Sequence, residues 1–332
     1  MISVVVVNWN RRVLLRACLE SLARQSDAEF ETIVVDNGST DGSAEVAEGE
    51  FGARVIRNTE NRGFCAANNQ GIAAARGEFI ALLNNDAEAE PGWLAEMRRA
   101  CASRADIGMA ACKVLRWDEP QRIDKAGHLI FPDGQNRGRG SGALDGGQFD
   151  CEEEVLWPDG CAAMYRRAML EEIGGFDEDF FAYGDDAELG LRARLAGWKC
   201  LYTPRAVVRH HRGATMGKGS AERLALIERN RVLLVLKLFP WSLLWLNPFY
   251  FALRLAAGAA MAAGGAGDTA HFPGVAGKLA MAGALVRGDL AALRMAPRML
   301  RKREEMRRMQ KLTPGEARRL ILENRLGWRE VA

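Results

Sequence analysis

The seven cysteines of this 332-residue chain include no CxxC pair, the spacing that most often marks a zinc site or a redox centre. They are scattered over the sequence, at Cys18, Cys65, Cys101, Cys112, Cys151, Cys161 and Cys200. The pattern therefore predicts neither a zinc ribbon nor a disulfide framework, and a reducing cytosol is the expected compartment.

Long apolar runs are also missing. The chain begins MISVVVVNWNRR, with no basic segment before an apolar run that is only as long as a strand, so we expect no signal peptide. In the most apolar stretch, the longest run without a charge extends from Leu238 to Leu253. This run is shorter than the roughly 20 residues that a membrane-spanning helix requires.

The composition is that of a folded protein, with 48% hydrophobic and 27% charged residues. The net charge of +2 is unevenly distributed along the chain. Residues 221–332 contain 19 Lys and Arg and 9 Asp and Glu, whereas residues 1–220 contain 26 Lys and Arg and 34 Asp and Glu. The two parts therefore carry +10 and −8. A basic C-terminal part predicts contact with something anionic, and phospholipid and nucleic acid are the usual candidates.

Residues 1–220 alternate between strand and helix patterns. Apolar, β-branched runs predict strands at 2–8, 30–36, 53–58 and 78–83, and helical patterns follow the first three of them. Strands that are buried on both faces and joined by helices form a parallel sheet. We therefore expect an α/β fold, with a mostly parallel sheet flanked by helices, over residues 1–220 and a helical, basic region over 221–332.

Polar residues follow each of these four strands. They are Asn8-Trp9-Asn10, Asp36-Asn37-Gly38-Ser39, Asn61-Arg62-Gly63-Phe64 and Asn84-Asn85-Asp86. Ligands of parallel sheets bind beyond the carboxyl ends of the strands, near the point where the strand order reverses. A single polar strand end is an ordinary loop, but four together predict a binding edge.

This edge lacks the features of a nicotinamide or ATP site. A dinucleotide-binding fold needs a G-x-G-x-x-G turn after its first strand so that the backbone approaches the pyrophosphate, and NWNRRV contains no glycine. A Walker loop is equally absent. Asp36 could imitate the ribose-binding acid of an NAD-type Rossmann oxidoreductase, but the missing glycine turn argues against that alternative.

Six segments in the right order resemble the inverting family 2 glycosyltransferases, which have the GT-A fold. They are VVVVNWNRRVLLRACLESL, VVDNGSTDGS, NRGFCAANNQGI, LLNNDAEAEPGWL, GCAAMYRRAMLEEIGGFDEDFFAYGDDAELGLRARLAGW and VVRHHRGAT, and together they cover roughly residues 2–220. Within the family, the chain is most similar to bacterial rhamnosyltransferase-like enzymes of cell-surface polysaccharide assembly. The resemblance implies a catalytic domain at 1–220 that transfers a sugar, with dTDP-rhamnose as the expected donor, to a hydroxyl of a lipid-linked or polysaccharide acceptor.

The resemblance also implies a divalent cation, Mg²⁺ or Mn²⁺, that stabilises the charge of the leaving diphosphate. Asp86 is its expected carboxylate ligand and His210 its expected imidazole ligand, with His211 in reserve. The family often has D-x-D where this chain has Asn84-Asn85-Asp86. Asn84 can donate and accept hydrogen bonds but adds no charge, so this cation site has one carboxylate fewer than a D-x-D site.

Asp186 is the general base that the resemblance implies. In an inverting transferase the base lies opposite the leaving diphosphate and takes the proton of the attacking hydroxyl. Asp186 matches the aspartate of the family's E-D pair, and Asp185 stands in place of the glutamate. Both acids fall in the first turn of an expected helix, where the helix dipole favours carboxylates, so capping that helix is an alternative role, above all for Asp185.

Other residues are assigned to the substrates by the same resemblance. For the donor they are Asn8 at the base pocket, Asp36 at the base or ribose, Arg62 and Gly63 near the nucleotide, Asn84 and Asn85 at the strand end, Asp159 and Gly160 under the sugar, and Arg212 with Thr215 at the diphosphate. For the acceptor they are Trp157, which could stack on a pyranose, and Tyr183. Two alternatives stay open, a core position for Trp157 and a surface salt bridge for Arg62.

The apolar stretch RVLLVLKLFPWSLLWLNPFYFALRLAAGAAMAAGGAG predicts an interfacial membrane anchor. Its Trp241, Trp245, Phe249 and Tyr250 are flanked by Lys and Arg, and RMAPRMLRKREEMRRMQK further on predicts a basic amphipathic helix suited to anionic headgroups. We therefore expect a cytoplasmic protein that is peripheral at the inner face of the cell membrane. A helical hairpin packed on the catalytic domain and a homodimer interface are the alternatives.

Two other classes of function use parts of the sequence. A nucleic-acid-binding protein would use the basic C-terminal part, but the acidic body and the lack of interleaved exposed aromatics argue against it, so we expect no nucleic-acid partner. A catalytically silent nucleotide-sugar sensor would need Asp36 and Asp86 without needing Asp186.

Overall fold

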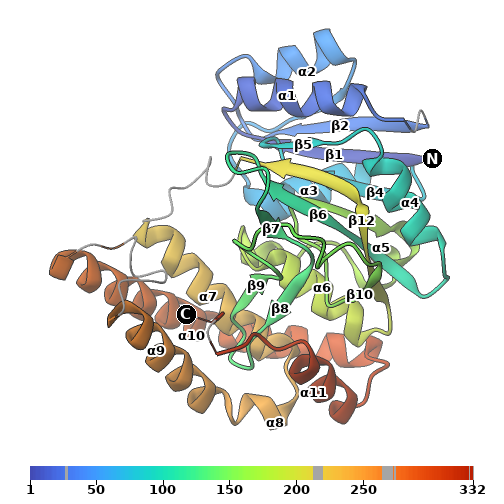
Figure 1. The fold of residues 1–332 in the computed structure, drawn as a ribbon. Helices are drawn as coiled ribbons and strands as arrows, with labels where there is room; N and C mark the ends of the chain where they lie inside the picture. The colour runs from blue at the N-terminus through green and yellow to red at the C-terminus, as the bar shows by residue number, and fades with distance from the viewer. Residues whose placement is uncertain (27–28, 212–219, 264–271, 273, 329, 332) are drawn as a thin grey trace. The chain divides into compact units, whose positions relative to one another are not determined.

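The structure is a computed structural model that describes residues 1–26, 29–211, 220–263, 272, 274–328 and 330–331 (Figure 1). The chain divides into two compact units. The first comprises Met1–His128 and Gly138–Arg212, and the second Leu129–Arg137 and Gly213–Ala332. The division lies near the boundary expected at residue 220, except that the short segment Leu129–Arg137 leaves the first unit and joins the helical one.

The first unit holds the sheet and the helices that cover it. Its elements are β1 (Ile2–Asn8), α1 (Arg12–Ala23), β2 (Phe30–Asp36), α2 (Ser43–Phe51), β3 (Arg54–Arg57), α3 (Gly63–Ala74), β4 (Phe79–Leu83), β5 (Ala87–Ala89), α4 (Trp93–Ala102), β6 (Ile107–Arg116), β7 (Ile123–Lys125), β10 (Glu153–Val155), β11 (Ala162–Arg166), α5 (Arg167–Ile173), the 3-10 helix η1 (Glu178–Phe180), α6 (Asp185–Leu195) and β12 (Lys199–His210). A short hairpin of β8 (His128–Ile130) and β9 (Asn136–Gly138) carries the chain into the second unit and back.

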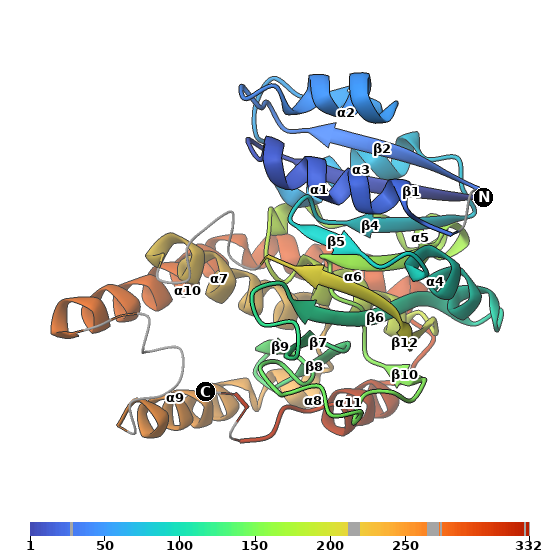
Figure 2. The same cartoon turned by 45° about the horizontal axis from the view of Figure 1, so that its top comes forward.

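Ten strands form one sheet with the order β10-β12-β6-β11-β4-β1-β2-β3, in which β5 also pairs with β12 and β7 with β6. The pairs β1–β2, β1–β4, β2–β3 and β6–β12 are parallel, whereas β11 runs antiparallel between β4 and β6. Figure 2 shows β2, β1, β4 and β6 following one another across this sheet. The expected α/β fold with a mostly parallel sheet is therefore confirmed.

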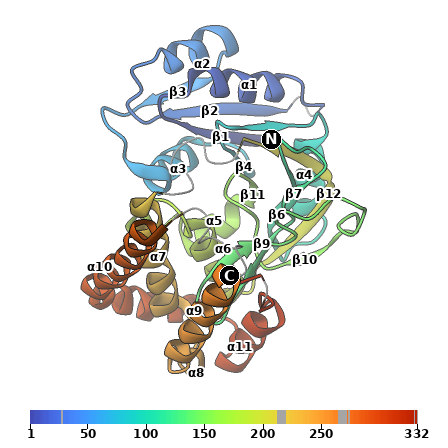
Figure 3. The same cartoon turned by 60° about the vertical axis from the view of Figure 1, so that its left-hand side comes forward.

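Burial on both faces explains the unbroken apolar run of β1. Val4, Val5 and Val6 are at most 1% exposed, and Figure 3 shows α1 and α2 on one side of β1–β3 and α3 on the other. β-branched side chains favour the pleated strand, and a strand covered on both sides has no polar face. The register pairs Asn8 with Asp36, so the polar ends of β1 and β2 lie side by side.

A loop with unusual backbone geometry precedes α6. Phe181, Tyr183 and Gly184 have φ values of 63°, 66° and 71°. Residues other than glycine rarely adopt this left-handed region, and such strain is concentrated at functional sites. The carbonyl of Phe181 accepts hydrogen bonds from the N–H groups of Phe64 and Cys65, so the start of α3 holds this loop in place.

The second unit is helical. It contains α7 (Ala221–Leu238), α8 (Trp241–Leu244), α9 (Asn247–Ala263), α10 (Gly274–Met309) and α11 (Pro314–Glu323), together with the tip of the β8–β9 hairpin. Figures 1 and 3 show α7 alongside α10. Within this unit, Arg254 links α9 to two other elements. It forms ion pairs with Asp133 of the hairpin tip at 2.6 Å and with Glu228 of α7 at 3.0 Å.

Within the described ranges, no helix combines the length and the apolar character that a membrane crossing demands.

Gly190 in α6 leaves no room for a side chain, because a Cβ there would lie 2.2 Å from the Cβ of Trp157. Gly49 in α2 offers a matched control, since nothing lies within 4 Å of such a Cβ. We expect Gly190→Ala to lower the free energy of unfolding by about 1–3 kcal/mol through overpacking. Gly49→Ala should raise it by about 0.5–1 kcal/mol through helix propensity. Urea unfolding measures both changes, and shifts of the same sign would contradict the packing at Trp157.

Candidate active site

Side chains tie the carboxyl ends of β1, β2 and β4 together. Asn8 Nδ2 donates hydrogen bonds to Asp36 Oδ1 and to Ser39 Oγ, both at 3.2 Å, and Asn85 Nδ2 donates to Asn8 Oδ1 at 2.7 Å. Asn8 and Asp36 are buried. The structure thus brings Asn8, Asp36 and Asn85 together through the side chain of Asn8.

Asp86 and His210 lie side by side where β5 pairs with the end of β12. The antiparallel register places His210 opposite Ala87, so that His210 Nε2 lies 3.4 Å from Asp86 Oδ1. The other ring nitrogen, Nδ1, lies 2.9 Å from Asp124 Oδ2. Burial by itself raises the pKa of Asp86, but the adjacent His210 outweighs burial and holds that pKa below its ordinary value. Burial lowers the pKa of His210, yet Asp124 and Asp86 raise it to about 9.

The pair of Asp86 and His210 fits a divalent cation. Asp86 Oδ1 is buried and, in the described part of the chain, lacks a hydrogen bond of ordinary geometry. A carboxylate oxygen beside an imidazole nitrogen is a ligand set for Mn²⁺, provided that the cation displaces the proton that Asp124 and Asp86 favour on His210, and Mg²⁺ accepts the carboxylate. Asp124 behind His210 orients the ring in the way that carboxylates orient metal-binding histidines.

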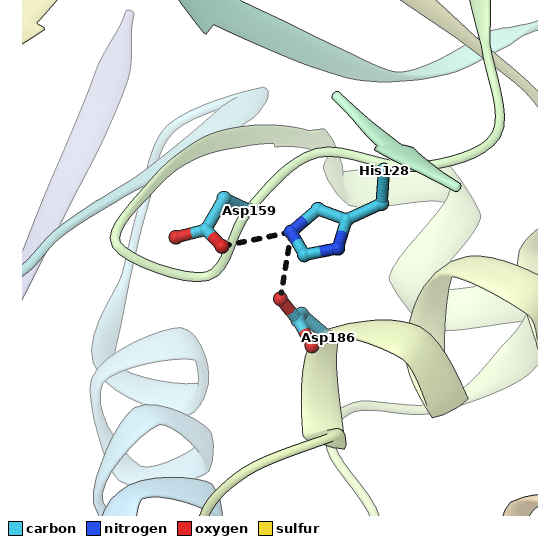
Figure 4. Close-up of side chains that lie close together, drawn as sticks. All are labelled: His128, Asp159 and Asp186. Carbon is cyan, nitrogen blue, oxygen red and sulfur yellow. Dashed lines mark hydrogen bonds and ion pairs between the residues drawn. The ribbon is translucent and has the colours of Figure 1, made fainter. Parts of the chain in front are cut away.

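A second polar group surrounds Asp186, and Figure 4 shows the ring of His128 between two carboxylates. His128 Nε2 lies 2.8 Å from Asp159 Oδ2 and 3.6 Å from Asp186 Oδ2. Lys125 Nζ also contacts Asp159 Oδ2, and the N–H of Gly160 donates to Asp186 Oδ2 at 3.3 Å. Ligand atoms of His128, Asp159 and Asp186 all lie within 4.8 Å of one another, so these three residues could also hold a metal ion.

The three acids of this group differ in burial and in charged neighbours. Burial raises the pKa of Asp159, but the Lys125 ammonium prevails and holds it well below its ordinary value. Burial and the charge of Asp186 raise the pKa of Asp185 well above its ordinary value, which favours a neutral acid. Lys125 neutralises Asp159 and Asp185 is buried, so Asp186, with its side chain 13% exposed, is the carboxylate that remains available to a substrate.

The two polar groups are continuous through β7. Asp124 contacts His210, and the next residue, Lys125, contacts Asp159. Asp159 contacts His128, which in turn faces Asp186. One set of contacts runs from Asp86 through His210 to Asp124, the other from Lys125 through Asp159 and His128 to Asp186, and the two meet at adjacent residues of β7 within the first unit.

Two residues expected at the substrates have other surroundings. Trp157 is completely buried, and its ring lies beside that of His128 with centroids 6.0 Å apart, so it has the core position rather than a face open to a sugar. Gly63 has a φ of 82°, and a Cβ there would lie 2.4 Å from the ring of Phe181. The glycine therefore accommodates Phe181, and the close approach that it permits is to this ring rather than to a nucleotide.

The remaining expected residues divide into three groups. Tyr183 is partly exposed in the loop before α6, and Arg62 is exposed at the start of α3. The backbone N–H of Asn84 donates a hydrogen bond to the carbonyl oxygen of Cys161, the residue before β11. Arg212 and Thr215 lie outside the described residues.

His211 does not share the position of His210. Its Nε2 lies 3.0 Å from Glu88 Oε1, and its ring stacks on Trp117 with centroids 4.3 Å apart. Only its backbone N–H reaches Asp86, where it donates to the carbonyl oxygen at 2.9 Å. Of the two histidines, His210 is therefore the one whose ring faces the Asp86 carboxylate.

Asp124, Lys125 and His128 belong to the site although periodicity does not reveal them. They lie in an irregular, glycine-rich stretch that has neither strand nor helix spacing. The signal that could have identified them is local, because an acid, a base and a histidine occur within the five residues DKAGH.

Asp185→Asn should stabilise the fold increasingly as the pH rises. The pKa of Asp185 is higher in the folded state than in the unfolded state, so folding takes up a proton. The free energy of unfolding of the wild type therefore falls as the pH rises from the unfolded-state pKa of about 4 towards the folded-state pKa. Asparagine has a similar shape and does not titrate. The gain should grow by up to about 1.4 kcal/mol per pH unit in that window.

Chemical unfolding of wild type and Asp185→Asn at a series of pH values from about 5 to about 8 measures this difference. The exposed Asp118→Asn is the matched control, and a substitution at such a surface position should change stability only slightly. A gain for Asp185→Asn that shrinks as the pH rises would contradict the assignment.

Two family models match the chain. Glycosyl transferase family 2 matches residues 3–174, and Glycosyl transferase family group 2 matches residues 148–276.

Among curated relatives, the protein y4gI of Sinorhizobium fredii is 29% identical over 237 residues, which are 65% of this chain and 25% of the relative. The N-acetylglucosaminyl-diphospho-decaprenol L-rhamnosyltransferase of Mycobacterium tuberculosis is 28% identical over 245 residues, which are 67% of this chain and 80% of the relative. The chain therefore spans only a quarter of the first relative and four fifths of the second.

Two solved structures share the fold. GalNAc-T7 with UDP, GalNAc and Mn²⁺ has a TM-score of 0.60 at 16% identity, over 78% of this chain and 51% of that one. The mannosyltransferase PcManGT of Pyrobaculum calidifontis, in complex with GDP-Man and Mn²⁺, has a TM-score of 0.53 at 21% identity, over 88% of this chain and 86% of that one. The GT-A architecture and a family match over more than half of the sequence agree, and the chain therefore belongs to glycosyl transferase family 2.

Proposed function

We propose that the protein is an inverting glycosyltransferase that moves a sugar from a nucleotide diphosphate to a hydroxyl of a lipid-linked or polysaccharide acceptor. The observation that carries this proposal is the continuous polar network from Asp86 to Asp186, with a cation-binding pair at one end and an available carboxylate at the other. The match to glycosyl transferase family 2 supports the reaction class.

The donor lies, in this proposal, along the carboxyl ends of β1, β2 and β4. Asp36 and Asn8 offer hydrogen-bonding groups to the base or ribose, and Asn84 and Asn85 offer them nearer the diphosphate. Arg62, exposed at the start of α3, supplies a positive charge towards the nucleotide. We propose dTDP-rhamnose as the donor because the mycobacterial relative is named an L-rhamnosyltransferase.

Asp86 and His210 are the proposed ligands of Mg²⁺ or Mn²⁺, and the two solved structures named above, GalNAc-T7 and PcManGT, contain Mn²⁺. When bound, the cation supplies positive charge to the oxygens of the leaving diphosphate. Asp86 offers a buried oxygen, and His210 offers a nitrogen whose orientation Asp124 sets. We prefer this pair to the group around His128, because Lys125 already occupies Asp159 there and would repel a second cation.

Asp186 is the proposed general base. Its carboxylate takes the proton of the acceptor hydroxyl while the hydroxyl oxygen forms a bond to the anomeric carbon. The bond from that carbon to the diphosphate oxygen breaks on the opposite face, and the diphosphate leaves with the electron pair, so the configuration inverts. The N–H groups of Gly160 and Ala187 each donate to one oxygen of Asp186 and fix its orientation, with His128 close to one of these oxygens.

The acceptor approaches, in this proposal, from the side of Asp186, where the partly exposed Tyr183 precedes the base by three residues. We propose a lipid-linked acceptor because the mycobacterial relative is named for a diphospho-decaprenol substrate. A peripheral position at the inner face of the cell membrane would bring the enzyme to such an acceptor.

Nucleotide-sugar screening by thermal unfolding tests the donor and the cation together. We expect dTDP-rhamnose with Mn²⁺ to raise the Tm of the wild type most, since a ligand that binds only the folded state stabilises it by about 2.7 kcal/mol at a hundred times its Kd. Asp86→Asn should abolish the part of the shift that requires Mn²⁺, and the exposed Asp118→Asn should retain it. A shift with nicotinamide cofactors alone would overturn the transferase proposal.

Asp186→Asn should lower kcat for sugar transfer by about 10²–10⁴, while the Kd of the donor changes little because the base faces the acceptor. Release of the nucleotide diphosphate measures turnover, calorimetry measures donor binding, and Asp118→Asn serves again as the control. If the wild type binds the donor, transfers nothing to any acceptor and is unaltered by Asp186→Asn, the protein is a sugar-nucleotide sensor instead.

A further inference from the structure

The long helix α10 has two apolar faces, and only one of them is covered. The covered face includes Ala284, Gly288, Ala292 and Met299 and lies against α7. The approach is close, because a Cβ on Gly288 would lie 2.6 Å from the carbonyl oxygen of Ala225. On the other side of α10, six large apolar side chains are exposed, namely Val275 (76%), Leu279 (68%), Val286 (58%), Leu290 (51%), Leu293 (62%) and Leu300 (40%).

These exposed side chains form one stripe along the helix, which we call the α10 stripe. Leu279, Val286, Leu293 and Leu300 recur at every seventh residue, which is close to two turns, and Val275 and Leu290 lie on the same side. At 1.5 Å per residue, the stripe is about 38 Å long. A contiguous apolar surface of this length is unusual on a soluble monomer and indicates a surface that something else covers.

A second exposed apolar face lies on α8 and α9. Its large side chains are Trp241 (47%), Trp245 (80%), Leu246 (42%), Phe249 (59%) and Leu255 (42%). Arg254 is the single charged residue of α9, and it is turned inward to Asp133 and Glu228. The exposed side of α9 therefore carries no charge.

The charges next to the α10 stripe indicate what covers it. Arg287, Arg294 and Arg301 are exposed and also recur at every seventh residue, so they form a row along one edge of the stripe. A second copy of the chain would bring its own arginine row to the same contact, and like charges would oppose that pairing. An anionic bilayer matches both features, because its headgroups attract the arginines and its acyl boundary accepts the apolar side chains.

We propose that the α10 stripe and the exposed face of α8–α9 are a docking surface for anionic phospholipid, with the helices lying in the headgroup region rather than crossing it. Trp245 and Phe249 enter the interface, where aromatic side chains are favoured. Arg287, Arg294 and Arg301 pair with lipid phosphates. This inference identifies the surface and the lipid charge behind the peripheral membrane position proposed above, and its test does not depend on sugar transfer.

Co-sedimentation of the full-length protein with vesicles tests the proposal. We expect binding to an equimolar mixture of phosphatidylcholine and phosphatidylglycerol, little binding to phosphatidylcholine alone, and weaker binding at high salt. The triple variant Arg287→Gln, Arg294→Gln and Arg301→Gln should weaken binding to the anionic vesicles on the order of a hundredfold. Free inorganic phosphate should not compete, because the apolar contacts require a bilayer.

Two pairs of substitutions separate the apolar surface from exposed apolar residues in general. Leu279→Ser with Leu293→Ser, and Trp245→Ser with Phe249→Ser, should each weaken vesicle binding by about tenfold or more. The matched control is Val13→Ser with Leu144→Ser, which removes equally exposed side chains (79% and 59%) from the first unit and should bind like the wild type. If a serine pair unfolds the second unit, the arginine variant still tests the surface.

Two results would overturn the proposal. Equal vesicle binding by the wild type, the arginine variant and the serine pairs would show that lipid binds elsewhere or not at all. A mass of twice the monomer in light scattering, reduced to the monomer by Leu279→Ser with Leu293→Ser while vesicles are not bound, would assign the α10 stripe to a second copy of the chain.

Discussion

The ammonium group of Lys125 stabilises an acidic centre that would otherwise repel itself. Asp159 is buried and accepts from Lys125, and Asp124, the residue before Lys125, pairs with His210. An unpaired carboxylate in such a place costs several kcal/mol, because burial removes its hydration. The charge of Lys125 thus permits buried acids on both sides of it, and the arrangement of the Asp86–His210 pair and of Asp186 depends on that balance.

The same balance distinguishes the adjacent acids of α6. Both stand at a helix N-terminus, where backbone N–H groups favour negative charge. Asp185 is buried and its pKa is raised well above the ordinary value, whereas the side chain of Asp186 is 13% exposed and accepts a hydrogen bond from the N–H of Gly160. The strained residues Phe181 and Tyr183 lie just before α6, and hydrogen bonds from the N–H groups of Phe64 and Cys65 to the Phe181 carbonyl hold this loop in place.

Much of the fold follows from local sequence, because unbroken β-branched runs are typical of strands that are covered on both faces. The positions of Asn8, Asp36 and Asp86 follow in turn, since parallel strands end at one edge.

The partner of each side chain does not follow from the sequence. From the sequence, Trp157 is equally compatible with stacking on a sugar and with a core position. Its packing against Gly190 in the structure shows that it is a core residue. From the sequence, Gly63 is predicted to contact the nucleotide. In the structure the ring of Phe181, which is distant in the sequence, occupies the space beside it. Asp124, Lys125 and His128 lie in a stretch without periodicity, and the exposed side of α10 cannot be told from its packed side when both are apolar.

The β8–β9 hairpin has a consequence for the modularity of the chain. It leaves the first unit after His128 and returns at Gly138, and its tip holds Asp133, which is fully buried against Arg254 and Arg231 of the helical unit. A fragment cut near residue 220 would retain this acid and lose both arginines, so neither half is a self-contained piece. Recombination with a relative would therefore need to exchange the hairpin tip along with the C-terminal helices.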